Sequence, residues 1–379
     1  MRGLPNGKHG SIMSVTTLFQ SAYKGKTVLV TGHTGFKGSW LAYWLHQLQA
    51  NVVGYSLPAP TEPSHWQLLH LPISHYEGDI SNVEQLKAVF NQHEPEVVFH
   101  MAAQPLVRYS YQHPLETIET NVLGTVKLLE CVRQCPSIRA VIIITSDKCY
   151  ENPEDGHPLR ETDPMGGYDP YSMSKGAAEL VTSSYRNSFF NVDHYGRTHQ
   201  TLIASVRAGN VIGGGDWASD RLIPDLVRGS LSRQPVTIRN PEAVRPWQHV
   251  LEPLSGYLLV GQKLLQGDTN AATGWNFGPA VDDVLSVRNV VEQAIDCWNV
   301  ISFNELSSVK NPHEAHLLRL DCTKAHRELD WYPVWDTNSA ITRTIDWYRT
   351  FYETEKLLTD VDLASYIQEA RARRLNWTT

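Results

Sequence analysis

A tyrosine and a lysine four residues apart are the side chains of this sequence best suited to moving a proton. Tyr171 and Lys175 begin a helical pattern that runs to Phe190, and residues at positions i and i+4 share one face of a helix. The pKa of a phenol is near ~10, and a neighbouring ammonium lowers it. The pair therefore predicts a base that takes the proton of an alcohol. Tyr168 competes for this role, but no lysine lies four residues after it.

A hydroxyl, a carboxyl and an amine follow a run of β-branched residues. The run 140–145 (AVIIIT) predicts a strand buried on both faces, and Ser146, Asp147 and Lys148 come directly after it. Ser146 could hydrogen-bond the same alcohol, and Asp147 could act as an acid if burial raises its pKa. Lys148 could act as a base only if its pKa falls from ~10.4. The alternative is an ordinary ion pair between Asp147 and Lys148.

Three glycines spaced three residues apart follow another short apolar run. The run 26–31 (KTVLVT) predicts a strand, and residues 38–49 have a helical period. Glycines let the backbone approach a pyrophosphate, which then lies at the positive end of the following helix. The order of strand, turn and helix favours a dinucleotide site over an ordinary turn. The expected contacts in the turn are Gly32, His33, Thr34, Gly35, Phe36, Lys37 and Gly38.

The elements that would position these residues alternate along the first half of the chain. Further strands are expected at 51–55, 96–100 and 201–206, and further helices at 83–92 and 115–134. Strands that alternate with helices indicate βαβ units. This pattern therefore predicts an α/β fold with a Rossmann-type, doubly wound parallel sheet.

Beyond Arg207 the pattern becomes irregular, which predicts two functional parts. Residues 22–206 are expected to form the dinucleotide-binding Rossmann domain. Residues 207–379 are expected to form mainly a smaller mixed α/β lobe for the substrate, with some segments returning to the Rossmann domain. Residues 1–21 look like a leader or tag and are expected to be disordered; within them, Arg2 to Ser11 look vector-derived, with Met13 as a candidate natural start.

Composition excludes several classes of protein. The 379 residues are 41% hydrophobic and 19% charged, with a net charge of −7, so the chain can fold and has no basic tract for nucleic acid or an anionic membrane. It has neither a run of ~18 apolar residues nor a secretory signal. Five cysteines are an odd count that does not indicate disulfides. Cys131 and Cys135 lack a companion His/Cys pair, so no metal is expected. We expect a cytoplasmic protein.

The chain resembles the extended short-chain dehydrogenase/reductase superfamily in its GxxGxxG turn and its YxxxK pair behind Ser146. The acid/base pair Asp147–Lys148 after the hydroxyl residue is similar to that of nucleotide-sugar 4,6-dehydratases. The dTDP and GDP branches of that family usually carry Glu at the second position. The lysine and the strings SDKCYEN, RAGNVIGGGDW, DRLIPD and RPWQHV resemble the branch that acts on CDP-glucose, from about Lys26 to about Trp347.

The resemblance implies a reaction in which oxidation is later reversed. Tyr171, with Lys175, would take the 4-hydroxyl proton of a CDP-hexose while NAD receives hydride from carbon-4. Asp147 would then protonate the departing 6-hydroxyl, and the hydride would return to carbon-6. Lys148 is the candidate base for the carbon-5 proton, or else it holds an enolate oxygen or orients Asp147.

The resemblance also implies cofactor contacts outside the turn. Asp79 with Ile80 matches an adenine contact, and Asp79 could cap a helix instead or in addition. No carboxylate or arginine follows the second strand, which ends at Ser56. NAD is favoured over NADP because the reaction regenerates it, although His33 and Lys37 could approach a phosphate. The remaining implied cofactor contacts are Ala102, Ala103, Gln104 and Thr145, beside Tyr171 and Lys175.

For the substrate, the resemblance implies diphosphate contacts from Asn210, Arg221 and Arg245. Trp217, Trp247 and His249 could pack on the pyrimidine or ribose, or could belong to the core. The hexose pocket is expected to be lined by Tyr109, Ser110 and Tyr150.

Helices 115–134 and 171–190 are expected to pair in a homodimer or a dimer of dimers, again by resemblance. Three functions remain open. One is the dehydratase, whose product would serve deoxysugar synthesis for a cell-surface polysaccharide such as O-antigen. The second is a 4-epimerase, or a dehydratase for a GDP-, dTDP- or UDP-sugar. The third is a non-catalytic NAD-sensing scaffold, a class that usually lacks the Tyr or the Lys.

Overall fold

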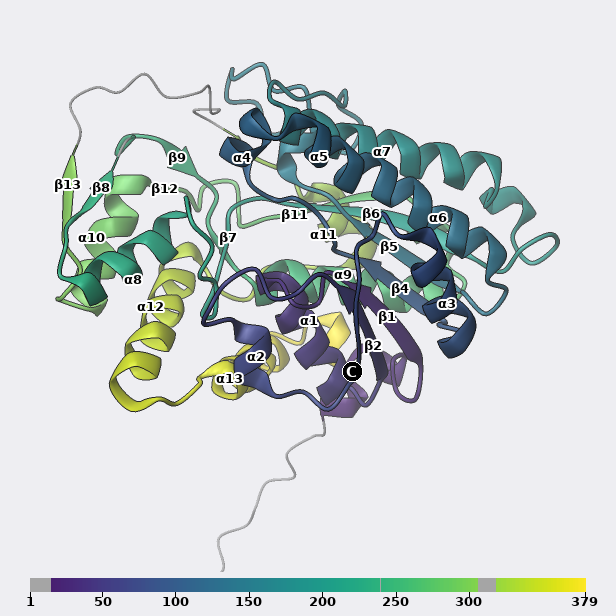
Figure 1. Cartoon of the computed structure of the whole chain (residues 1–379), viewed down its shortest axis with the longest axis horizontal. Helices are drawn as coiled ribbons and strands as arrows, with labels where there is room; N and C mark the ends of the chain where they lie inside the picture. Colours follow the sequence, from purple (N-terminus) through teal and green to yellow (C-terminus); the bar gives the residue numbers. More distant parts are fainter. Residues whose placement is uncertain (1–14, 239, 306–317) are drawn as a thin grey trace, which may run out of the picture.

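Short apolar runs form the centre of the molecule. The computed structural model describes residues 15–238, 240–305 and 318–379, and within these ranges seven parallel strands make one sheet in the order β11-β6-β5-β4-β1-β2-β3 (Figure 1). The order reverses between β1 and β4, so the sheet is doubly wound and the predicted fold class is confirmed. The strands are β1 (Thr27–Thr31), β2 (Asn51–Ser56), β3 (Ser74–Glu77), β4 (Val97–His100), β5 (Ala140–Ile144), β6 (Leu202–Ala208) and β11 (Gly274–Phe277).

Helices cover both faces of the sheet because successive strand residues point to opposite sides. In β4, Val97 and Phe99 share an apolar cluster with α1 and α9, whereas Val98 shares a cluster with α3 and α6. Figure 1 shows α6 and α7 side by side along the sheet. The first face is covered by α1 (Phe36–Gln47), α9 (Leu251–Leu265), α11 (Thr323–Leu329) and α13 (Thr359–Ala372), and the second by α3 (Val83–His93), α6 (Gly124–Gln134) and α7 (Pro170–Ser188).

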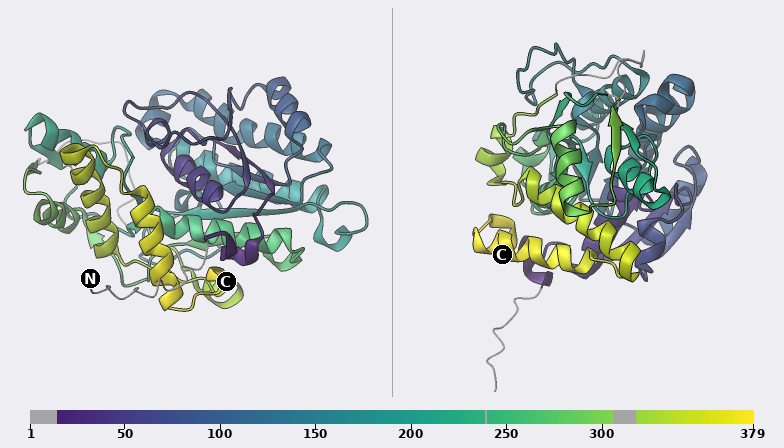
Figure 2. Two further views of the ribbon diagram at one scale, coloured as in Figure 1. Left: turned by 90° about the horizontal axis from the view of Figure 1, so that it is seen from below. Right: turned by 90° about the vertical axis from the view of Figure 1, so that its left-hand side faces the viewer.

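A smaller lobe lies beside the sheet and has its own apolar cluster, which includes Trp217 and Trp347. Figures 1 and 2 show its helices grouped on one side of the molecule. Because α9, β11, α11 and α13 return to the sheet, the chain crosses between the two parts more than once. The lobe contains β7 (Val211–Ile212), α8 (Leu222–Ser232), β8 (Val236–Ile238), β9 (Val244–Arg245), β10 (Gln248–His249), β12 (Leu285–Ser286), α10 (Val287–Cys297), β13 (Phe303–Glu305) and α12 (Thr337–Thr354).

The long helix expected at 115–134 consists of three consecutive segments. α5 (Pro114–Ile118) continues into a π-helical segment, η2 (Glu119–Leu123), and then into α6. No helix in the described ranges combines the length and apolar content needed to cross a bilayer. The remaining elements are α2 (His65–Leu69), α4 (Val107–Gln112) and the short 3-10 segments η1 (Val15–Ser21), η3 (Asp147–Cys149), η4 (Val192–His194), η5 (Thr269–Ala271) and η6 (Asn376–Thr378).

The expectation of disorder for the whole leader is wrong at its end. Residues 1–14 lie outside the described ranges, but η1 is ordered and buries Leu18 and Phe19 completely. The Phe19 ring stacks on Trp377, with 5.4 Å between the ring centroids. Apolar burial against the C-terminal segment therefore orders Val15–Ser21.

The carboxyl group of Glu252 is a buried link between α9 and the C-terminal part of the chain. The backbone N–H groups of Val334 and Trp335 donate to it over 2.9 and 2.7 Å, and the Tyr366 hydroxyl donates over 2.9 Å. Burial raises the pKa of Glu252 to about 7. Because the pKa of an unfolded glutamate is near ~4.3, the folded state holds this proton more tightly than the unfolded state.

We therefore expect Glu252 to make the free energy of unfolding fall as the pH rises from about 5 to about 8. Glu252→Gln cannot ionise and should remove up to about 3 kcal/mol of this pH dependence. At about pH 5, Glu252→Gln should lower the free energy of unfolding by roughly 1–3 kcal/mol, because the amide nitrogen of glutamine cannot accept a hydrogen bond from a backbone N–H. Urea unfolding of both proteins at the two pH values measures both effects. An equal pH dependence in the variant would contradict the raised pKa.

Candidate active site

Several chain segments meet at the carboxyl ends of the strands, where they line a pocket of about 390 Å³. The sheet domain supplies one wall and the lobe supplies Arg221, Arg245 and Trp247, so the pocket lies between the two parts. Motifs far apart in the sequence are thereby brought together. The predicted site residues that line the pocket are Phe36, Lys37, Thr145, Ser146, Asp147, Lys148, Tyr171, Asn210, Arg221, Arg245 and Trp247.

The Ser146 hydroxyl stands between the two predicted proton-transfer groups. It donates a hydrogen bond to the Asp147 carboxylate over 2.9 Å, and it is hydrogen-bonded to the Tyr171 phenol. Tyr171 lies in the first turn of α7, where the Asp169 side chain caps the helix by accepting from the Ser172 N–H over 2.9 Å. The end of β5 and the start of α7 therefore bring the predicted base, Tyr171, and the predicted acid, Asp147, to the hydroxyl of Ser146.

The expected lowering of the phenol pKa does not appear in this structure. Burial raises the pKa of Tyr171 to about 12, with the Ser146 hydrogen bond and the Arg221 charge opposing the rise. Lys175 is itself buried and donates to the Ile144 carbonyl over 3.4 Å. Burial, together with the charge of Lys37, lowers the pKa of Lys175 to about 7. Burial of both members of the pair thus outweighs the effect of the ammonium on the phenol, and the lowering that the oxidised nicotinamide would add stays a prediction.

Asp147 has the raised pKa that an acid requires. Its side chain is buried, and burial raises its pKa, although Lys148, Ser146, Arg245 and Lys37 act in the opposite direction. The alternative of an Asp147–Lys148 ion pair is not found among the ion pairs of the described residues. Lys148 instead lines the pocket.

The glycine turn has the shape that a dinucleotide needs. Gly32 has φ +74°, and a Cβ there would lie 2.7 Å from the Ala102 nitrogen. A Cβ on Gly38 would lie 2.1 Å from the Gly32 carbonyl, so both contacts require glycine. A Cβ on Gly35 would meet only the Gly32 carbonyl, at 3.4 Å, which leaves that face of the turn open. Gly35 caps α1 without a side-chain hydrogen bond, so the first N–H groups of the helix fit a pyrophosphate.

His33 cannot approach a phosphate with its side chain, contrary to the suggestion from the sequence. Its ring is fully buried against the edge of Trp66, and its Nε2 lies 2.8 Å from the His75 Nδ1. At the end of β2, where an acidic residue is absent, the Thr34 and Ser56 hydroxyls hydrogen-bond over 2.8 Å. These two hydroxyls are the polar groups that this end of the strand offers a ribose.

Asp79 is not a helix cap, so that alternative is wrong. The cap of α3 is Asn82, whose side chain accepts from the Gln85 N–H over 3.1 Å. Asp79 is exposed and accepts from the Ser81 N–H over 2.7 Å, and the following Ile80 is buried.

Asn121, which no motif marked, fastens the loop after β4, where Ala102, Ala103 and Gln104 lie. It accepts from the Gln104 N–H over 2.8 Å and donates to the Gln104 carbonyl over 3.0 Å and to the Ser174 hydroxyl over 2.8 Å. It lies in the π-helical segment η2, a kind of distortion that often occurs at functional sites. No sequence signal marks this role, because Asn121 is one of several polar residues in the stretch 115–134.

Two predicted substrate contacts are instead parts of the buried core. The Trp217 indole donates to the Tyr352 hydroxyl over 2.9 Å inside the lobe. His249 is fully buried between the rings of Trp40 and Trp335. Neither side chain lines the pocket, which corrects the expectation that they contact the nucleotide.

The predicted hexose contacts also lie outside the pocket. Ser110 is fully buried behind Tyr171, whose N–H it accepts over 3.1 Å. Tyr150 is buried and donates to Asn276 over 2.7 Å, so it too cannot line the pocket. The Tyr109 hydroxyl donates to Glu116 over 2.8 Å. A position next to a motif does not fix the direction of a side chain. Ser110 and Tyr150 point into the protein interior, where they support the pocket wall and do not line the pocket.

The lobe presents arginines that are already oriented. Arg221 donates to the buried Asp216 carboxylate over 2.7 Å, and Arg245 reaches the pocket from β9. Arg108 of α4, which no motif marked, pairs with Asp220 over 3.3 Å and links the sheet domain to the lobe. Guanidinium groups of this kind bind diphosphates well.

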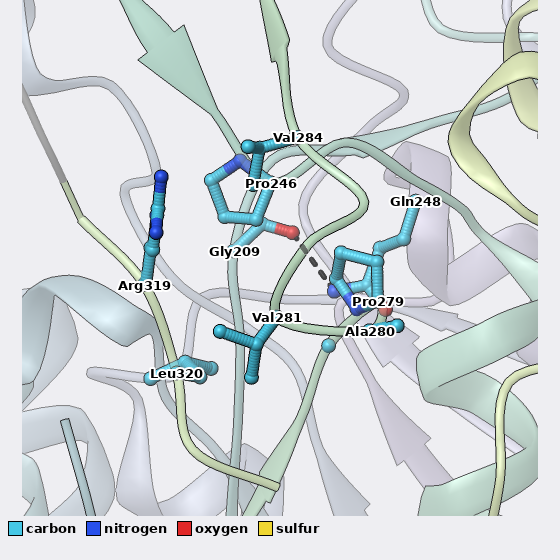
Figure 3. Close-up of a pocket in the computed structure, with 10 residues that line it drawn as sticks. Gly209, Pro246, Gln248, Pro279, Ala280, Val281, Val284, Arg319 and Leu320 are labelled. Carbon is cyan, nitrogen blue, oxygen red and sulfur yellow. Dashed lines mark hydrogen bonds between the residues drawn. The ribbon is translucent and has the colours of Figure 1, made fainter. Parts of the chain in front are cut away.

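A much smaller pocket of about 10 Å³ shares Gly209 with the larger pocket. Figure 3 shows Gln248, whose side-chain amide donates to the Gly209 carbonyl over 3.0 Å, close to Pro279. Such a volume holds one water molecule at most. It therefore belongs to the wall of the larger pocket and is no ligand site.

The doubly wound sheet, the glycine turn and the Tyr171–Lys175 pair beside Ser146 define the chain as an extended short-chain dehydrogenase/reductase. The model of the GDP-mannose 4,6 dehydratase family matches residues 29–344. A CDP-glucose 4,6-dehydratase of Salmonella typhimurium is 52% identical over 338 residues, which are 89% of this chain and 94% of that protein. The chain belongs to this family of nucleotide-sugar dehydratases.

Solved structures share the fold. A dTDP-glucose 4,6-dehydratase from Streptomyces venezuelae with NAD bound matches with a TM-score of 0.73 at 24% identity, over 85% of this chain and 97% of that chain. A UDP-glucose 4-epimerase from Thermus thermophilus in complex with NAD also matches with a TM-score of 0.73, at 23% identity, over 85% and 99%.

Proposed function

We propose that this protein is an NAD-dependent CDP-glucose 4,6-dehydratase, a hydro-lyase that forms CDP-4-keto-6-deoxy-D-glucose. The observation that carries the proposal is the placement of a buried carboxyl group, Asp147, on the same hydroxyl as the Tyr171 phenol. An epimerase needs the base but no acid for elimination. The 52% identity to a CDP-glucose 4,6-dehydratase supports the choice of substrate.

The first step needs a base at the sugar's 4-hydroxyl. NAD, bound at the glycine turn, would accept hydride from carbon-4, return it later to carbon-6 and, with its positive ring, lower the phenol pKa. Tyr171 takes the 4-hydroxyl proton, and Ser146 hydrogen-bonds the same oxygen. Lys175 supports the phenolate from the next turn of α7.

The second step removes water across carbons 5 and 6. Asp147 gives its proton to the carbon-6 hydroxyl as the C–O bond breaks, and a base takes the carbon-5 proton so that a double bond forms. The raised pKa of Asp147 keeps that proton available. We assign the base role to Lys148, which lines the same pocket.

Turnover of CDP-glucose in heavy water, without added NADPH, tests the function. We expect a 4-keto-6-deoxy product labelled with deuterium at carbon-5. A 4-epimer would favour an epimerase, and NAD binding without turnover would favour a scaffold. Parallel assays with dTDP-, GDP- and UDP-hexoses test the nucleotide, and slower turnover of CDP-glucose than of any of these would overturn its assignment.

Replacing Lys148 with alanine is expected to abolish deuterium exchange at carbon-5, because the amine to which we assign that proton is then removed. Oxidation at carbon-4 should continue, since Tyr171 and Ser146 are unchanged. Mass spectrometry of recovered sugar measures the exchange, and the absorbance of reduced nicotinamide measures the oxidation. Normal exchange in Lys148→Ala would exclude the base role.

The exposed side of α5, η2 and α7 supports a homodimer or a dimer of dimers. Leu115, Leu123 and Leu180 are 69%, 46% and 62% exposed there, and helices with such apolar faces pair readily. Sedimentation of the full chain tests this assembly. We further propose a cytoplasmic location and a role in supplying a deoxysugar for a cell-surface polysaccharide such as O-antigen.

A further inference from the structure

Lys37 occupies a place in the fold that helix stability does not explain. It lies in the first turn of α1, where the positive end of the helix dipole disfavours a cation. None of the ion pairs between described residues includes it. It lines the same pocket as Ser146, Asp147 and Tyr171. Its ammonium therefore belongs to the site in which the sugar would react.

Charged groups from three other segments of the chain act on this ammonium. The attraction comes from Asp147 of η3, and the repulsion comes from Arg221 before α8 and from Lys175 of α7. Burial and Arg221 lower the pKa of Lys37 to about 8, so it is mostly charged at neutral pH. The other titratable groups that line the same pocket are Lys148, Tyr171, Arg245, Asp216, Arg108, Asp220 and Asp225.

Building on the proposed function, we propose that Lys37 is a positioning residue for the elimination of water: its ammonium stabilises the carboxylate that Asp147 becomes. As the Asp147 O–H bond breaks, the proton joins the carbon-6 oxygen, the C–O electrons leave with it as water, and Asp147 is left with a negative charge. A nearby cation in a largely buried site stabilises such a developing charge. This role differs from the phosphate contact that the sequence suggested for Lys37.

The test compares Lys37→Met and Lys37→Arg in single turnovers with CDP-glucose and NAD. Lys37→Met should slow the loss of water roughly 10- to 100-fold, somewhat less than losing a directly bonded donor. Oxidation at carbon-4 should proceed, so reduced nicotinamide accumulates. Lys37→Arg should restore most of the rate. As a control, Lys87→Met should behave as wild type, since Lys87 is a partly exposed lysine of α3 that pairs with Glu84 away from the pocket.

Two further measurements separate this role from others. Above pH of about 8 the wild-type rate of water loss should fall as Lys37 loses its proton, whereas Lys37→Arg should keep its rate. The dissociation constant for NAD, measured by fluorescence titration, should be nearly unchanged in Lys37→Met. A large rise in that constant, or equal slowing of oxidation and water loss, would overturn the proposal. If the wild type itself leaves CDP-glucose unchanged, the proposed function fails instead.

Discussion

Replacing Tyr171 with phenylalanine is expected to lower kcat by about 10³-fold, within the range that a positioned base contributes. The substitution removes only the phenol oxygen. The start of α7 keeps its place because the backbone N–H of this residue still donates to Ser110 over 3.1 Å. Oxidation at carbon-4 should therefore be lost together with turnover, and no reduced nicotinamide should form in a single turnover.

The matched control is Tyr168→Phe. Tyr168 lies three residues earlier and is 77% exposed, so its loss should leave turnover and the binding of NAD unchanged. The binding of NAD to Tyr171→Phe should also be close to that of the wild type, since the glycine turn is intact. A Tyr171→Phe protein that keeps more than about a tenth of the wild-type kcat would show that another group removes the 4-hydroxyl proton.

Features that a local pattern determines could be predicted from the sequence. Strands such as β5 are short apolar runs, and the turn at Gly32 and Gly38 needs glycine because a side chain would collide with Ala102 or with the turn itself. Parallel strands present their carboxyl ends at one edge of a sheet. That rule was sufficient to bring Ser146 and Tyr171 into one site.

Features that depend on which way a side chain points could not be predicted. Trp217 and Trp247 are equally apolar and both lie in motifs, yet only Trp247 lines the pocket. Lys37 belongs to the cofactor turn by sequence, but in the structure it lines the same pocket as Asp147. The direction of such a side chain depends on packing between the sheet and the lobe. The spacing of residues along the sequence carries no information about that packing.

Replacing Arg207 with leucine is expected to destabilise the fold by about 3–5 kcal/mol. Arg207 and Glu179 are both almost fully buried, and two guanidinium nitrogens donate to the two carboxylate oxygens, each over 2.8 Å. The hydroxyls of Thr145 and Ser205 also donate to Glu179. Without the arginine, the buried carboxylate would lose its ion-pair partner and keep only these two hydroxyls as side-chain hydrogen-bond donors.

The pH dependence of this loss tests its cause. In the wild type, Arg207 and the hydrogen bonds overcome burial and hold the pKa of Glu179 below its usual range, so this carboxylate stabilises the fold at neutral pH and less as the pH falls. In Arg207→Leu, burial should raise that pKa, and the difference in the free energy of unfolding between the two proteins should shrink toward pH ~4.

The double variant Arg207→Leu with Glu179→Leu should lose less free energy of unfolding than Arg207→Leu alone, because no charge remains unpaired. Urea unfolding of the three proteins measures these differences, and a loss that is the same at every pH would contradict the electrostatic cause. Since Thr145 joins this network and immediately precedes Ser146, the pair also holds the end of β5 on which the proposed acid and base meet.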